Sequence, residues 1–197
     1  MKKKCSLLKR ISLVKIFVIL IILSSCGQKT DSVNDAVKDF TYTNQNGKSF
    51  GLKDLSGKVW IANFIFTKCE DVCPPMTYNM KKLQTMSKKE EIENIQFVSF
   101  SVDPTVDSSD VLKKFGESFQ VDFVNWNFLT GYSQKDIEYL ALDSFKSVVK
   151  KPDQGDQVIH ETQFYLVDKE GKVYKNYTGL NEIPYDEIIS DIKTLQD

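Results

Sequence analysis

The chain has 197 residues, enough for one domain with a substantial hydrophobic core. It carries 26 basic and 27 acidic residues, but six of the basic residues and none of the acidic ones lie in residues 1–25, so the remainder has 20 basic and 27 acidic residues, a net charge of −7. Such an acidic chain is not expected to bind nucleic acid or to present a basic membrane-binding face.

Residues 1–25 are typical of a secretory signal peptide. Basic residues come first, and the apolar run that follows, Ile16 to Leu23, is too short to span a bilayer as a permanent helix. Leu23-Ser24-Ser25-Cys26 resembles the lipobox of bacterial lipoproteins, in which the signal is cut before the cysteine and the cysteine carries lipid. A plain signal peptide with a chance cysteine is the alternative. We expect residues 1–25 to be a lipoprotein signal peptide and Cys26 to be the lipidated residue.

This processing would attach the chain by lipid to the cell membrane, on its extracytoplasmic face. Residues 26–38 are mostly polar and lack apolar periodicity, which predicts a lipidated tether ahead of a domain at residues 39–197. Cys5 would leave with the signal peptide and Cys26 would carry lipid, so only Cys69 and Cys73 would remain as thiols in the domain. In an extracytoplasmic compartment such a pair can oxidise to a disulfide.

A hairpin and a buried strand are the first predicted elements of the domain. Phe40 to Leu52 alternates around Asn46-Gly47, the dipeptide preferred in type I′ turns, which predicts a small hairpin. Val59 to Phe66 contains seven apolar side chains and one Asn, the pattern of a strand buried on both faces.

Two cysteines follow that strand directly. Cys69 and Cys73 precede Pro74-Pro75, and proline fits the first turn of a helix, so a helix is predicted over Pro74 to Lys89. A helix N-terminus lowers a thiol's pKa, and a helix that began near Cys69 would put both sulfurs on one face. Two thiolates there could close a disulfide or hold one soft metal ion.

The remaining patterns alternate between strands and helices. They predict strands over 95–102, 123–129, 162–167 and 173–177, and helices over 108–119, 133–145 and 184–195. This order predicts an α/β, thioredoxin-like domain, a central mixed sheet flanked by helices, with an added N-terminal hairpin and an inserted helix. Thioether sulfur can bind copper, but Met76, Met80 and Met86 have the spacing of core residues and are expected to fill the core.

His160, the one histidine of the chain, stands just before the predicted strand at 162–167. In thioredoxin-like folds the loop before this strand faces the cysteine turn and usually carries a cis-proline, and here a histidine stands about where that proline would be. Two thiolates and one imidazole suit Cu(I) by softness, and can hold Cu(II) when a fourth ligand completes the plane. Zinc also fits these ligand types.

Three motifs together resemble the Sco/SenC proteins. They are F-T-K-C-E-D-V-C-P at Phe66 to Pro74, S-V-D-P at Ser101 to Pro104, and V-I-H at Val158 to His160. Proteins of that family are thioredoxin-like copper proteins that help assemble the dinuclear copper centre of cytochrome c oxidase. The resemblance covers about residue 39 to the C-terminus and implies copper as the bound metal.

The resemblance also implies roles for individual residues. Cys69 and Cys73 would be the copper thiolates and the redox disulfide pair, and His160 would be the third ligand. Asp103 matches the family's acidic residue near the metal, but a turn or capping role explains it nearly as well, so it stays outside the expected ligand set. Many members have proline after the first cysteine where this chain has Glu70, whose charge should raise the thiol pKa values somewhat.

These features point to one expected function and two alternatives. A metallochaperone that passes copper to the copper-containing subunit of the oxidase, acting as a monomer rather than as an enzyme, is the leading expectation. The alternative is a thiol-disulfide oxidoreductase that reduces the cysteines of that subunit, although such reductases normally use Cys-x-x-Cys. A thiol peroxidase is disfavoured because peroxidases of this fold usually need an arginine and Arg10, in the signal peptide, is the only one.

Overall fold

The computed structural model describes residues 36–155 and 157–197. The predicted signal peptide, Cys26 and most of the predicted tether lie outside these residues. Within the described part of the chain, no helix has both the length and the apolar character needed to cross a membrane.

One seven-stranded sheet with the order β2-β1-β5-β4-β3-β6-β7 organises the domain. Its strands are β1 (Thr41–Asn44), β2 (Ser49–Gly51), β3 (Trp60–Ile65), β4 (Gln96–Ser101), β5 (Trp126–Thr130), β6 (Gln163–Val167) and β7 (Val173–Thr178). The helices are the short 3-10 helix η1 (Leu52–Leu55) and α2 (Cys73–Lys89), α3 (Ser109–Ser118), α4 (Gln134–Phe145) and α5 (Tyr185–Gln196).

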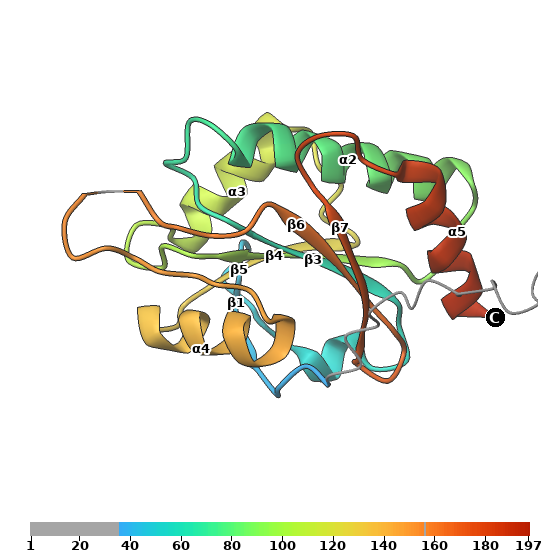
Figure 1. Ribbon diagram of the computed structural model, residues 1–197, viewed down its shortest axis with the longest axis horizontal. Helices are drawn as coiled ribbons and strands as arrows, with labels where there is room; N and C mark the ends of the chain where they lie inside the picture. The colour runs from blue at the N-terminus through green and yellow to red at the C-terminus, as the bar shows by residue number, and fades with distance from the viewer. Residues whose placement is uncertain (1–35, 156) are drawn as a thin grey trace, which may run out of the picture. The chain divides into compact units, whose positions relative to one another are not determined.

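Strand β3 lies inside the sheet, parallel to β4 on one side and antiparallel to β6 on the other. Strand β5 is parallel to β4, and the hairpin β1–β2 adds to β5 at the far side. Helices α2, α3 and α5 cover one face of the sheet and α4 covers the other (Figure 1). The predicted thioredoxin-like fold is therefore confirmed, together with its added N-terminal hairpin.

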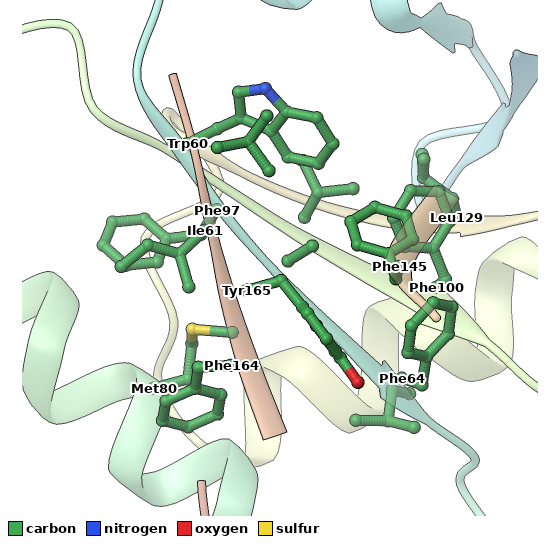
Figure 2. Packing of buried hydrophobic residues seen from close by; sticks show 14 of the residues in the cluster. Trp60, Ile61, Phe64, Met80, Phe97, Phe100, Leu129, Phe145, Phe164 and Tyr165 are labelled. Carbon is green, nitrogen blue, oxygen red and sulfur yellow. The ribbon is translucent and has the colours of Figure 1, made fainter. Parts of the chain in front are cut away.

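The core lies on both faces of β3, whose six residues are all buried, as predicted. Phe145 of α4 packs against Trp60, Phe64 and Tyr165, with ring centroids 5.2–6.2 Å apart. Figure 2 shows these rings together, while Met80 of α2 lies on the opposite side of the sheet. The prediction that the methionines fill the core is confirmed. Met76 and Met80 are fully buried, and Met86 is partly buried and packs against the core.

The N-terminal hairpin forms as predicted, but its turn is of a different type. A type I′ turn needs positive φ at both central residues. Gly47 has φ +70°, whereas Asn46 is not among the positive-φ residues. The Asn44 carbonyl accepts from the Gly47 N–H (2.9 Å), and the Asn44 side chain accepts from the N–H groups of Asn46 and Lys48. The Asn44 side chain thus stabilises a longer loop with glycine at its left-handed position.

Residues 36–38, which we expected to belong to the tether, pack against the domain. Ala36 pairs with Lys172, and the Val37 N–H donates to the Gly171 carbonyl at 2.8 Å. Val37 is buried, and the Lys38 N–H donates to the Ser144 hydroxyl of α4. The chain therefore joins the domain beside the end of α4.

Candidate metal centre

The sheet register brings three segments to one point beyond the carboxyl end of β3. In the parallel pair, Ile65 is opposite Ser101, and in the antiparallel pair, Ala62 is opposite Tyr165. Continued past the strand ends, these registers place Thr67, Asp103 and His160 at the same level. The carboxyl ends of strands in open α/β sheets are where sites form. The register thus explains why a histidine 87 positions after Cys73 faces the cysteine turn.

The two cysteines meet through a loop rather than along one helix face. Helix α2 begins at Cys73, within one residue of the predicted start at Pro74. Cys69 therefore lies in the loop before the helix, and the two sulfurs do not share one helix face as they would if the helix began near Cys69. The Cys73 N–H, one of the free amides of the first turn, donates to Cys69 Sγ at 3.4 Å. Both thiols are free and buried. The backbone N–H at the start of α2 therefore donates a hydrogen bond to the Cys69 sulfur, and Cys73 is itself the first residue of the helix.

The expectation that the helix N-terminus would favour a Cys73 thiolate is not met in the metal-free site. Burial raises the pKa of the Cys73 thiol well above its ordinary value, and the neighbouring Cys69 and Asp107 raise it further. The hydrogen bond from the Phe66 backbone opposes this but is outweighed. A buried thiolate loses its hydration, and one helix end does not replace it. Cys73 therefore keeps its proton until a cation takes the proton's place.

His160 is fixed in the tautomer that a metal ligand requires. Its Nδ1 lies 3.0 Å from the Glu161 carbonyl oxygen, which can only accept, so Nδ1 carries the proton. Burial lowers the pKa of His160, so the ring is neutral and Nε2 has a free lone pair. Nε2 lies 3.4 Å from Cys73 Sγ and accepts from that thiol. The Phe66 ring packs edge-on against the imidazole, with centroids 5.8 Å apart.

The donor atoms of Cys69, Cys73 and His160 lie within 4.8 Å of one another. A metal ion among them would replace the proton shared between Cys73 and His160, and the Nδ1–H bond to a backbone carbonyl is the usual outer support of a metal-bound histidine. The donor set is two soft sulfurs and one imidazole, which fits Cu(I), Cu(II) or Zn²⁺. Asp103 is not in this group, and its carboxylate contacts the Lys151 ammonium at 2.7 Å.

Sequence reasoning overlooked Asp107, which is fully buried behind the cysteine loop. It accepts hydrogen bonds at 2.6 Å from the hydroxyls of Thr67 and Ser101, and a longer one from the Thr67 N–H. Burial raises the pKa of Asp107, and these hydrogen bonds oppose the rise. Asp107 thus joins the cysteine loop to the end of β4. In the sequence, Asp107 is an acidic residue four positions after Asp103, in a polar turn before a predicted helix. An acidic residue at that position looks like an ordinary helix-start residue, so the sequence alone does not mark it as part of the site.

The comparisons with known proteins agree with this geometry. The SCO1/SenC family model matches residues 28–197. A SCO1/SenC family lipoprotein from Bacillus anthracis str. Ames superposes with a TM-score of 0.82 and 53% identity, over 85% of this chain and 98% of that one. BsSco, described as a member of the Sco family of cytochrome c oxidase assembly proteins with a disulfide switch, gives a TM-score of 0.78 and 52% identity over 84% and 96%.

A more distant structure was solved with metal. Bradyrhizobium japonicum ScoI with copper bound has a TM-score of 0.66 and 26% identity, over 81% of this chain and 99% of that one. The family model covers most of the sequence, including both cysteines and His160. The chain belongs to the SCO1/SenC family.

Proposed function

We propose that this protein is an extracytoplasmic copper metallochaperone that helps assemble the dinuclear copper centre of cytochrome c oxidase. Copper is its cargo, held by the thiolates of Cys69 and Cys73 and by Nε2 of His160. The recipient is the copper-containing subunit of the oxidase. The proposed carrier acts as a monomer anchored to the membrane by lipid on Cys26.

The observation that carries the proposal is the arrangement of His160. A neutral imidazole with its Nδ1–H held by the Glu161 carbonyl directs its lone pair at the cysteine pair. That arrangement is what a third metal ligand requires and is not needed for thiol exchange. The copper-bound structure of a family member and the description of BsSco as an oxidase assembly protein support copper as the metal and the oxidase as the destination.

One observation favours a second function, a thiol-disulfide oxidoreductase that reduces the cysteines of the oxidase copper site. The Sγ atoms of Cys69 and Cys73 lie within 4.8 Å of each other, so the two thiols are near neighbours that can close a disulfide. The disulfide switch reported for BsSco agrees with such chemistry. In this function the two cysteines give up two electrons and two protons to the disulfide of the target, and become a disulfide themselves.

A copper titration of the reduced protein tests the first function. We expect one copper per chain, and for Cu(II) an intense visible absorption from thiolate-to-copper charge transfer. Oxidation to the Cys69–Cys73 disulfide removes both thiolates and should abolish binding. Copper binding that survived in the Cys69→Ser, Cys73→Ser double variant would place the metal elsewhere and overturn the proposal.

A further inference from the structure

We propose that the ion pair between Lys151 and Asp103, called the clamp below, is a positioning device that sets the distance from His160 to the two cysteines. The inference rests on the proposed function, in which His160 is a copper ligand. It gives Asp103 a role through Lys151 rather than as a ligand to the metal.

The Asp103 side of the clamp is rigid. The Asp103 side chain is 3% exposed, and the Asp103 N–H donates to the Ser101 hydroxyl at 3.1 Å. The Thr105 hydroxyl donates to the carboxylate at 2.7 Å, and the Lys151 ammonium donates to the same oxygen at 2.7 Å and contacts the Thr105 hydroxyl at 3.0 Å. An ion pair so well supplied with hydrogen bonds offsets the cost of its burial. Lys151 is thereby held against the turn that follows β4.

The Lys151 side of the clamp is coupled to the histidine. Lys150 and Ile159 form an isolated antiparallel bridge, each N–H donating to the other's carbonyl at 2.9 Å. This bridge closes a loop, with Lys151 next to it on one strand and His160 next to it on the other. The Lys151 N–H is also held, since it donates to Glu138 of α4 at 3.2 Å. Fixing Lys151 therefore fixes the strand that carries His160.

The same turn also holds the cysteines. Ser101, which accepts from the Asp103 N–H, donates to Asp107, and Asp107 accepts from Thr67 two residues before Cys69. The turn after β4 thus lies between the cysteine loop on one side and the histidine loop on the other. Loss of the clamp would free only the histidine side, since the bonds of Asp107 remain.

A direct ligand role for Asp103 makes a different prediction from the clamp. If the carboxylate bound copper, it would have to leave Lys151, so removing the lysine would leave copper affinity unchanged or increase it. In the clamp, the lysine and the aspartate are equally necessary, and either substitution should have the same effect. The comparison of the two single variants therefore separates the two roles.

The experiment uses the reduced full-length protein with Lys151→Met, Asp103→Asn and the double variant. Cu(II) affinity by ligand competition, the charge-transfer band, Cu(I) affinity and the rate of thiol exchange are measured for each. We expect each single variant to lose Cu(II) affinity about tenfold, and the double variant to lose no more, because residues of one pair act non-additively. The charge-transfer band should shift, while Cu(I) affinity and thiol exchange change little because both cysteines stay in place. Lys151→Arg, which keeps the charge, should restore most of the loss.

Lys193→Met is the matched control, because Lys193 pairs with Glu90 at 3.1 Å on an exposed surface and should leave copper binding at the wild-type value. A Lys151→Met variant with wild-type or tighter Cu(II) binding overturns the clamp, and a loss confined to Asp103→Asn assigns Asp103 as a ligand. If Asp103→Asn does not fold, Lys151→Met decides alone, because the Lys151 side chain is 27% exposed. Failure of the proposed function can be told apart from failure of the clamp, because in that case the wild-type protein itself would bind no copper at the cysteines.

Discussion

The two nitrogens of the His160 ring have different roles. Nδ1 makes the hydrogen bond that orients the ring, and the lone pair of Nε2 faces the thiol of Cys73. Both depend on neighbours: the Glu161 carbonyl selects the tautomer, and the Phe66 ring packs edge-on against the imidazole. Cys73, fully buried, has its proton directed at Nε2. In the metal-free protein these residues form a neutral hydrogen-bonded pair, which a copper ion would convert to a thiolate and an imidazole ligand.

His160→Ala separates the two proposed functions. A thiol reductase has no chemical need for the imidazole, so thiol exchange should stay within a fewfold of wild type. A carrier needs the ring most for Cu(II), because two thiolates can hold linear Cu(I) but leave a tetragonal ion short of ligands. Cu(II) affinity should fall at least roughly tenfold, about 1.4 kcal/mol, with a smaller loss for Cu(I).

The same variant can be assayed in a cell that makes a copper-containing oxidase, with and without added copper. Poor oxidase assembly that excess copper rescues supports the carrier. Normal assembly with His160→Ala, combined with lost assembly in either cysteine variant, would replace the chaperone with the reductase.

Asp107 is a second residue whose role can be tested by substitution. Asp107→Ala leaves the donors of Thr67 and Ser101 without their acceptor in a buried place. We expect the free energy of unfolding to fall by about 2–3 kcal/mol, and the cysteines to react faster with a disulfide reagent because their loop is released. Asp107→Asn should cost less, since its amide oxygen still accepts. Urea unfolding measures the first effect, and equal losses in Asp107→Ala and in exposed Asp110→Asn would contradict it.

At the scale of elements, the helices place the loops that carry the site. Helix α2 starts at Cys73, and α4 holds the histidine loop through the contact of Glu138 with the Lys151 N–H. Helix α4 itself begins with a capping box: the Ser133 hydroxyl accepts from the Asp136 N–H, and the Asp136 carboxylate accepts from the Ser133 N–H and hydroxyl. Serine is among the residues preferred at this N-cap position.

The cap of α4 gives a pH-dependent prediction. The hydrogen bonds from Ser133 lower the pKa of Asp136 below its ordinary value of 3.8. A lowered pKa means that the stabilisation is present above the ordinary value and is lost as pH falls through the folded-state value. Asp136→Asn should therefore be less stable than wild type at neutral pH, and the difference should shrink as the pH falls below about 4. Urea unfolding at pH 7 and pH 3 measures this, and a difference independent of pH would rule out the ionised cap.

At the scale of the whole molecule, the described domain presents its site at one end of the sheet and receives the chain beside α4. The proposed lipid on Cys26 would hold it near the membrane, since the segment from Cys26 to Ala36 reaches at most roughly 35 Å when fully extended.

Cys26→Ala tests the anchor. The variant should lack lipid and be either retained unprocessed in the membrane or released, with the domain still folded, because Cys26 lies outside the described domain. Two or more acyl chains hold a protein firmly on a bilayer, whereas one holds it weakly. Partitioning of the mature protein into a detergent phase gives the readout. Unchanged partitioning after the substitution would reject lipid attachment at Cys26.

The sequence alone predicted the main helices and strands and the candidate metal ligands, because both can be recognised from short stretches of sequence. The apolar run at 59–66 predicts a strand buried on both faces, and the pattern over 133–145 predicts α4. Cys69, Cys73 and His160 were identified by residue type, since few side chains bind soft metals. The type of the hairpin turn was predicted wrongly, because the Asn44 side chain, and not the Asn46-Gly47 dipeptide alone, stabilises the loop.

Only the tertiary structure decided how these residues act. The protonation of Cys73 depends on burial, which the helix-end argument left out. The contact between His160 and Cys73 depends on the antiparallel register of β6 on β3, and the positions of Asp107 and Lys151 depend on where β4 ends relative to both. Desolvation and hydrogen bonding act through space, between residues such as Cys73 and His160 that are 87 positions apart, and the spacing along the chain does not reveal that they are close.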